Sequence, residues 1–201
     1  MNSNYLYEYA NVLECVLSVG YENNYTSSSL ERMISYSSYF QSIEKDNNGF
    51  APIINDSELI NGFFPNLKID LAEVPSYNQC LWAAEAYLRI QGKTGLTFEC
   101  IFLYLPISEM YEYFPLYHEM DFSHIIMEFN RLFKEKSVLE ILIEKYHYSL
   151  NDIAEQINIS YETLSSLKRR RRDIKKASIE LVIKLSQIFN VRIETIAEIA
   201  I

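Results

Sequence analysis

The sequence is poor in glycine, proline, cysteine and long apolar runs. Five glycines and five prolines in 201 residues are few for a sandwich or barrel, which turns roughly every eight to twelve residues, so an all-β fold is disfavoured. Three cysteines, at positions 15, 80 and 100, match neither a zinc-ligand spacing nor an even-numbered disulfide framework, and we expect them to be reduced. The longest apolar run, 100–107, is far shorter than a membrane span, and the N-terminus lacks the features of a secretory signal. We therefore expect a cytoplasmic protein that does not bind membranes.

Positive charge is also in deficit. With 18 Lys and Arg against 27 Asp and Glu, the net charge is −9, which by itself argues against binding to nucleic acid. The charge is unevenly distributed, however. Residues 137–201 hold ten basic and nine acidic residues, net +1, and residues 1–136 hold the other eight and eighteen, net −10. This division predicts two domains, an acidic and aromatic-rich one at 1–136 and a second one at 137–201.

The hydrophobic pattern predicts a mainly all-α chain, because 49% of the residues are hydrophobic and their spacing is helical over most segments. All ten glycines and prolines precede residue 137, so the last segment is expected to be helices joined by tight turns. In the first segment we expect helices at 5–17, at 28–43 opened by Ser28, after Asn55 in a loop-rich stretch, and at 77–91 capped by Ser76. The run 96–105 is ambiguous between strand and helix, with helix favoured, and 107–133 should hold one or two helices broken near Pro115.

The C-terminal segment divides into five short predicted helices, at 137–146, 149–157, 160–170, 178–189 and 193–200. In the second helix, Ala154 is small where another helix must cross closely. The turn that follows suits a helix pair, since Asn158 tolerates a left-handed backbone and Ser160 can cap the next helix. The second and third helices therefore have the layout of a helix-turn-helix.

Residues 149–165 (SLNDIAEQINISYETLS), with the later run LVIKLSQIFNV at 181–191, resemble the DNA-binding domain of the phage repressors Cro and cI, the XRE-like family. The resemblance covers about the last third of the chain, with Asn158 standing where the family usually has glycine. It implies a five-helix lambda-repressor-like helix-turn-helix domain that binds double-stranded DNA, as a symmetric homodimer. The second helix of the pair would enter the major groove.

The candidate DNA-binding residues come from this helix pair and the basic run after it. Segment 168–176 holds seven positive charges and one negative, and such a run beside a recognition helix is expected to contact phosphates, whereas most charge runs are solvated loops. Leu164 and Leu167 should face inward, which leaves polar residues for base edges. The candidates are Ser149, Ser160, Tyr161, Glu162, Thr163, Ser165, Ser166, Lys168, Arg169, Arg170, Arg171 and Arg172.

Other constellations are weaker. His118, Asp121 and His124 could approach one metal on a continuous helix, but positions i and i+6 point to different sides, so surface or hydrogen-bonded histidines are expected instead. The sequence shows no Ser/His/Asp set, phosphate loop or HExxH motif, and we expect no enzyme, cofactor or metal. Glu85 and Glu99 lie in apolar runs, where helix-surface carboxylates are commoner than buried acids. Most of the aromatic residues are expected in the core, while Tyr111, Tyr113 and Tyr117 could line a protein-binding surface.

The sequence thus predicts a sequence-specific DNA-binding transcriptional regulator, most simply a repressor, with a regulatory or protein-binding domain at 1–136. The alternative is an antitoxin-like or inhibitor protein, whose acidic domain binds a partner protein while the C-terminal domain autoregulates its operon. The charge division adds a further expectation, that the acidic segment folds back on the basic run and masks it.

Overall fold

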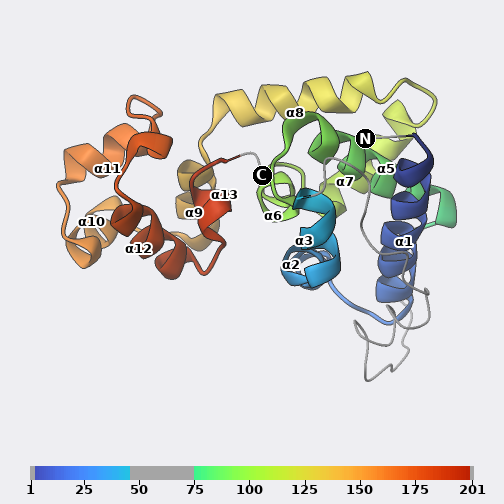
Figure 1. Cartoon of the computed structure of the whole chain (residues 1–201), viewed down its shortest axis with the longest axis horizontal. Coiled ribbons are helices and arrows are strands. Elements are labelled where there is room, and N and C mark those ends of the chain that lie inside the picture. Colours follow the sequence, from blue (N-terminus) through green and yellow to red (C-terminus); the bar gives the residue numbers. More distant parts are fainter. Residues whose placement is uncertain (1–2, 46–74, 200–201) are drawn as a thin grey trace.

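The computed structural model describes residues 3–45 and 75–199, and in these ranges its secondary structure is helical, without strands (Figure 1). This confirms the predicted all-α class. The helices are α1 (Ser3–Glu22), α2 (Ser27–Tyr36), α3 (Ser38–Lys45), α5 (Tyr77–Thr94), α6 (Phe98–Tyr104), α7 (Ile107–Tyr117), α8 (Ser123–Glu135), α9 (Val138–Tyr146), α10 (Leu150–Ile157), α11 (Tyr161–Lys168), the 3-10 turn η1 (Ile174–Lys176), α12 (Ile179–Phe189) and α13 (Ile193–Ile196). The helix expected after Asn55 lies outside the described residues. None of the described helices combines the length and apolar character needed to cross a bilayer.

Helices α1 and α5 form the most extensive helix contact of the acidic segment. The predicted cap of α5 is confirmed: Ser76 and Gln79 form a reciprocal capping box, and Gly95 ends the helix in the left-handed conformation, with φ 68°. Gly20 shows how closely the end of α1 approaches α2, since a Cβ atom there would lie 2.3 Å from Cδ2 of the buried Leu30.

The single helix predicted at 28–43 is divided. Its first part, α2, is capped by Thr26, whose hydroxyl accepts the Ser29 backbone N–H at 3.3 Å, so the prediction that Ser28 opens the helix was wrong. Ser37 then adopts an extended backbone, with φ −69° and ψ 128°, and α3 begins one residue later. Because of this break, both helices bury apolar side chains, Ile34 in α2 and Phe40 in α3.

The next two predictions are confirmed. The ambiguous run at 96–105 forms a helix, α6, which is capped by Thr97. The segment 107–133 forms two helices, α7 and α8, and α7 ends at Tyr117, close after Pro115. Pro115 lies inside the last turn of α7, where it has no N–H to donate to the carbonyl four residues earlier, so the helix is weakened near its end.

Several helix N-termini are capped by glutamates that come from distant helices. The carboxylate of Glu31 accepts the Ile107 N–H at the start of α7, at 2.8 Å. Glu44 accepts the Phe98 N–H at the start of α6, at 2.6 Å. A carboxylate at this position satisfies an orphan donor and opposes the positive end of the helix dipole. Tertiary packing therefore completes helices whose local sequence leaves a donor unpaired.

The five predicted C-terminal helices are present as α9 to α13. Their predicted first residues Ser137, Ser149, Ser160 and Ser178 are N-caps, each accepting a backbone N–H. The third helix ends at Lys168 rather than residue 170, and the fifth ends at Ile196 rather than residue 200. Both ends are followed by a residue with positive φ, 53° at Arg170 and 50° at Glu198, which cannot continue a right-handed helix.

Figure 1 shows α9 to α13 at one end of the molecule and α1 to α7 at the other. Helix α8 lies along the top of the second group in this view, and its C-terminal end leads into α9. The two groups meet through buried polar contacts around α13. The hydroxyls of Thr97 and Thr195 form a buried hydrogen bond of 2.9 Å. Glu99, expected on a helix surface, is half-buried on α6 and accepts the Arg192 backbone N–H and the Thr195 hydroxyl, at 2.8 and 2.7 Å. The two groups are thus joined by specific hydrogen bonds as well as by the chain.

Candidate nucleic-acid interface

The helix pair predicted from residues 149–170 forms as α10 and α11, which pack against each other. Ser149 accepts the Asn151 N–H at the start of α10, and Ser160 accepts the Thr163 N–H at the start of α11, both at 3.2 Å. The turn between them begins at Asn158, which is left-handed as predicted, with φ 58° and ψ 54°. The inward side chains of the two helices are buried, namely Ile153, Ala154, Ile157, Leu164 and Leu167.

The opposite face of α11 is open to solvent. Tyr161 is 46% exposed, and Glu162 beside it is also exposed. Thr163, Ser165 and Ser166 are half-buried. The structure thus brings five of the sequence-predicted residues together on one short helix. A hydroxyl-rich face of this kind offers donors and acceptors to a ligand, although the Ser166 hydroxyl already donates to the Glu162 carbonyl, at 2.7 Å.

The basic run folds back toward the start of α11. The backbone N–H groups of Arg171 and Arg172 both donate to the Ser166 carbonyl, at 2.8 and 3.1 Å, so the chain makes a tight turn after the helix. This turn places the Arg172 guanidinium 3.5 Å from the Thr163 hydroxyl. Arg169, Arg171 and Arg172 are exposed, and none of them forms an ion pair with another residue in the described ranges.

Two members of the basic run have internal partners. The Lys168 ammonium lies 3.4 Å from the Glu140 carboxylate on α9. The Arg170 guanidinium donates to the Glu198 carboxylate at 2.9 Å, to the Phe133 carbonyl, and to the Tyr104 hydroxyl at 3.4 Å. Arg170 is therefore placed to fix the end of α11 against α6, α8 and the C-terminal turn. The sequence grouped it with its exposed neighbours because a run of arginines carries no signal of which one folds inward.

Comparisons of the chain with protein-family models, with curated proteins and with solved structures each found no match.

A cavity of about 340 Å³ lies beside α11, between its first turn and the start of α12. It is lined by Thr163 and Arg172 on one side and by Lys176 and Ser178 on the other. Ser178 was predicted only as the start of a helix, and its hydroxyl caps α12 by accepting the Leu181 N–H. Its place beside α11 could not be predicted, because it depends on the turn that the basic run makes.

The three side chains considered for a metal site, those of His118, Asp121 and His124, contact other groups. His118 stacks on Phe114 and lies with Nδ1 2.9 Å from the Phe114 carbonyl, while His124 stacks on Tyr117. The Asp121 carboxylate is bonded by the Ser123 hydroxyl and accepts the Ser123 N–H at 2.8 Å, and these two bonds, the first above all, lower the pKa of Asp121. Within residues 3–45 and 75–199, no group of three potential ligand side chains converges on a metal-sized site.

The tyrosines considered for a protein-binding surface have different positions. Tyr111 is largely buried, with its ring edge-on to Tyr21 and its hydroxyl 3.6 Å from the Cys80 sulfur. Tyr113 and Tyr117 stack on each other at 5.6 Å between ring centroids and remain partly exposed. The three tyrosines therefore do not form one continuous surface.

Proposed function

We propose that the chain is a sequence-specific DNA-binding transcriptional regulator that binds double-stranded DNA through α11 and the turn after it. The observation that carries the proposal is the exposed start of α11, followed by Arg169, Arg171 and Arg172, which are exposed and form no ion pair in the described part of the chain. A short helix with a buried apolar side and a free polar side, preceded by a packed helix and a tight turn, is the form of a recognition helix.

The N-terminal turn of α11 would meet base edges. Tyr161 and Glu162 extend from it into solvent, and Thr163 lies one residue further on. Residues near the start of a recognition helix contact base edges, where a glutamate can accept from the cytosine amino group. Tyrosine and threonine can bond to phosphates or contact the thymine methyl group. These three side chains are proposed to determine sequence preference.

The arginines after α11 would meet the phosphate backbone. Arg169, Arg171 and Arg172 have exposed guanidinium groups, and Arg172 also reaches Thr163. Guanidinium groups bind phosphate oxygens in bidentate fashion and release counterions, so this contribution to affinity falls with salt. Lys168 and Arg170 are assigned to holding the helix in place, because their charges face Glu140 and Glu198.

The test is selection of binding sites from a random duplex library by the full-length protein, followed by affinity measurements over a range of salt. The triple variant Arg169→Ala, Arg171→Ala, Arg172→Ala should bind the selected duplex more weakly, with a salt slope smaller by roughly two to three phosphate contacts. The control triple variant Lys45→Ala, Lys93→Ala, Lys134→Ala removes the same charge from exposed positions in the acidic segment and should leave the slope unchanged. Failure to enrich any sequence would contradict the proposal.

A protein-binding role for the acidic segment has one supporting observation. Leu116, Met120 and Met127, on α7, the following turn and α8, are 65%, 48% and 63% exposed. Exposed apolar side chains of this size mark sites of protein contact when they are contiguous on a surface, and the protein-binding role requires this of these three. If the antitoxin-like alternative holds, a neighbouring gene product should co-purify with the wild-type chain. It should be lost from the variant with serine at all three positions.

A further inference from the structure

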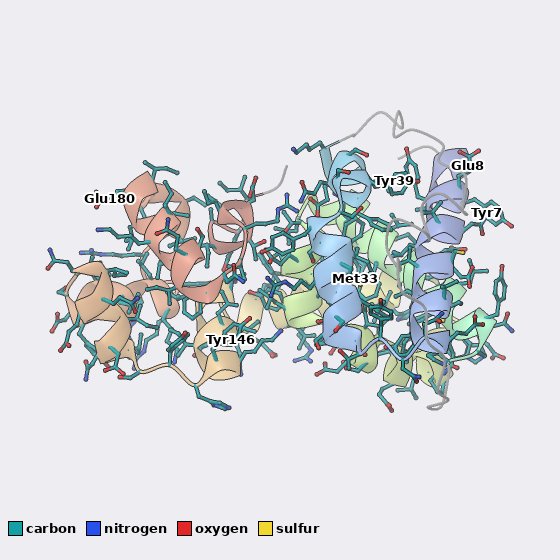
Figure 2. The ribbon with its side chains drawn as sticks, turned by 90° about the horizontal axis from the view of Figure 1, so that it is seen from below. Tyr7, Glu8, Met33, Tyr39, Tyr146 and Glu180 are labelled. Atoms are coloured by element: carbon teal, nitrogen blue, oxygen red, sulfur yellow. The ribbon has the colours of Figure 1, made fainter. Side chains whose placement is uncertain are left out.

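A second cavity, of about 400 Å³, lies where the acidic segment meets the C-terminal helices. One wall is α2 and the other is the end of α9 with the turn after α12, while α6 forms the floor. Figure 2 labels Met33 on α2 and Tyr146 on α9, the two helices on either side of it. The volume is within the usual range of small-molecule sites, which often lie between domains.

Each of the two walls carries one cationic side chain and one tyrosine. Helix α2 contributes Arg32 and Tyr36, and α9 contributes Lys145 and Tyr146. Both tyrosine rings are unusually open, at 45% and 47% exposure. The Arg32 guanidinium lies 5.8 Å from the centroid of the Tyr36 ring, so the cation and the aromatic surface of that wall are adjacent.

The floor is partly apolar, with Phe102 and Leu103 of α6. Tyr36 is held against this floor, because its hydroxyl donates to the Glu99 carboxylate at 3.0 Å and to the Asn190 carbonyl at 3.2 Å. Burial and the Glu99 charge raise the pKa of Tyr36 to about 12, so the phenol is neutral at physiological pH. The wall is thus a fixed aromatic surface.

The charge available to a ligand in this cavity is positive. The carboxylates of Glu31 and Glu99 also line it, but each already accepts hydrogen bonds from protein donors. Arg32 and Lys145 are exposed, and neither side chain forms a hydrogen bond or an ion pair among residues 3–45 and 75–199; the Arg32 guanidinium lies over the Tyr36 ring, and the Lys145 charge acts on Glu31 without an ion-pair contact. Their N–H donors can therefore bind an acid.

We propose that this cavity binds a small aromatic carboxylate. The carboxylate lies between Arg32 and Lys145, which form charge-assisted hydrogen bonds with it, and the ring lies against Tyr36 and Tyr146. Since the two walls belong to different parts of the chain, such a ligand joins the acidic segment to the helices that carry the candidate DNA interface. The site goes beyond the proposed function, because the cavity exists whether or not α11 binds DNA.

The test uses naphthaleneacetate as the probe and its neutral amide, naphthaleneacetamide, as the matched control, with binding to the full-length protein measured by calorimetry. We expect saturable binding of the acid. Arg32→Gln and Lys145→Gln should each weaken it about tenfold, the effect of losing one hydrogen bond to a charged group. Lys93→Gln removes an exposed positive charge elsewhere and should have no effect. Thermal melts of each variant establish that it is folded.

Several outcomes would overturn the proposal. They are the absence of saturable binding, equal binding of the amide, and binding that Arg32→Gln and Lys145→Gln leave unchanged. Tighter binding of the corresponding amine, naphthylmethylamine, would show that Glu31 and Glu99 determine the ligand and would equally contradict it. Because no DNA is present in the assay, these results stand apart from those that test the DNA-binding proposal.

Discussion

The Arg192 guanidinium donates to the Glu44 carboxylate at 2.6 Å, and the two side chains, 148 residues apart in the sequence, are almost completely buried. Arg192 precedes α13 and Glu44 lies near the end of α3, so this ion pair joins the two parts of the molecule. Glu44 uses its other oxygen to cap α6. The Glu44 carboxylate therefore caps α6 and also binds Arg192 where the two parts of the molecule meet.

Glu44→Gln should strongly destabilise the protein. The amide can still accept the Phe98 N–H, but the buried Arg192 would keep only the more distant and exposed Glu194, at 3.8 Å, as a counter-charge, and breaking a buried pair costs up to about 3–5 kcal/mol. Urea unfolding monitored by circular dichroism measures the change. Glu180→Gln, which breaks an exposed pair with Lys184, is the control and should have no measurable effect. Equal stabilities of the two variants would contradict this prediction.

Glu31→Gln should change how stability depends on pH. Burial raises the pKa of Glu31, more than the Ile107 N–H lowers it, so the folded protein binds this proton more tightly than the unfolded chain does. The stabilisation is therefore complete below the unfolded pKa and is lost as pH rises through the folded pKa. Relative to wild type, the variant should gain unfolding free energy as pH rises above 4.5, the ordinary pKa of a glutamate.

Urea unfolding at several pH values measures this effect. Glu180→Gln is again the control, because the pair of Glu180 with Lys184 is exposed and screened by solvent, so its stability should follow that of wild type across this range. A constant difference between Glu31→Gln and wild type across this range would rule the prediction out.

Arg169 and Arg170 should respond differently to substitution. Arg170→Gly removes hydrogen bonds to α6, α8 and Glu198 and should lower the melting temperature. Arg170→Ala should lower it further, because alanine at φ 53° costs about 1 kcal/mol more than glycine. Arg169→Ala should leave the melting temperature unchanged and weaken DNA binding. Thermal melts and binding to the selected duplex, measured on the same samples, separate the two roles, and a reversed pattern would refute the assignment.

Asn158→Gly should be neutral or slightly stabilising, whereas Asn158→Ala should cost about 1 kcal/mol, because the turn requires a left-handed residue. Thermal unfolding compares the two. The same pair of substitutions at Asn151, in the first turn of α10, is the control. There alanine should be the better residue, since glycine lowers helix stability. If alanine were also better at position 158, the turn would not need its left-handed conformation.

Local patterns predicted the C-terminal helices well. Serines at Ser137, Ser149, Ser160 and Ser178 are all N-caps, because a hydroxyl before an apolar-periodic run offers the backbone a nearby acceptor. Asn158 adopts the left-handed conformation because asparagine tolerates this backbone geometry, which is a property of the residue itself. Signals of this kind involve only residues a few positions apart, so they can be read from the sequence.

Non-local contacts could not be predicted in this way. The sequence gives no sign that Glu99 meets Thr195, or that Arg170 alone among four consecutive arginines folds against Phe133. The masking expectation is not met within residues 3–45 and 75–199. There, Lys168 and Arg170 pair with Glu140 and Glu198 of their own segment, Arg170 contacts Phe133 and Tyr104 but no carboxylate of the acidic segment, and Arg169, Arg171 and Arg172 are exposed. Net charges of whole segments do not determine which side chains meet.

The glutamates that cap distant helices have a consequence for how the molecule unfolds. Ile107 and Phe98 keep their capping partners only while α2 and α3 remain packed, and the N-terminus of α9 depends in the same way on Glu198 beyond α13. Loss of any one contact leaves a backbone N–H without its partner at a helix N-terminus elsewhere in the chain. We therefore expect these contacts to couple the unfolding of α2, α3 and the C-terminal turn to that of the helices they cap.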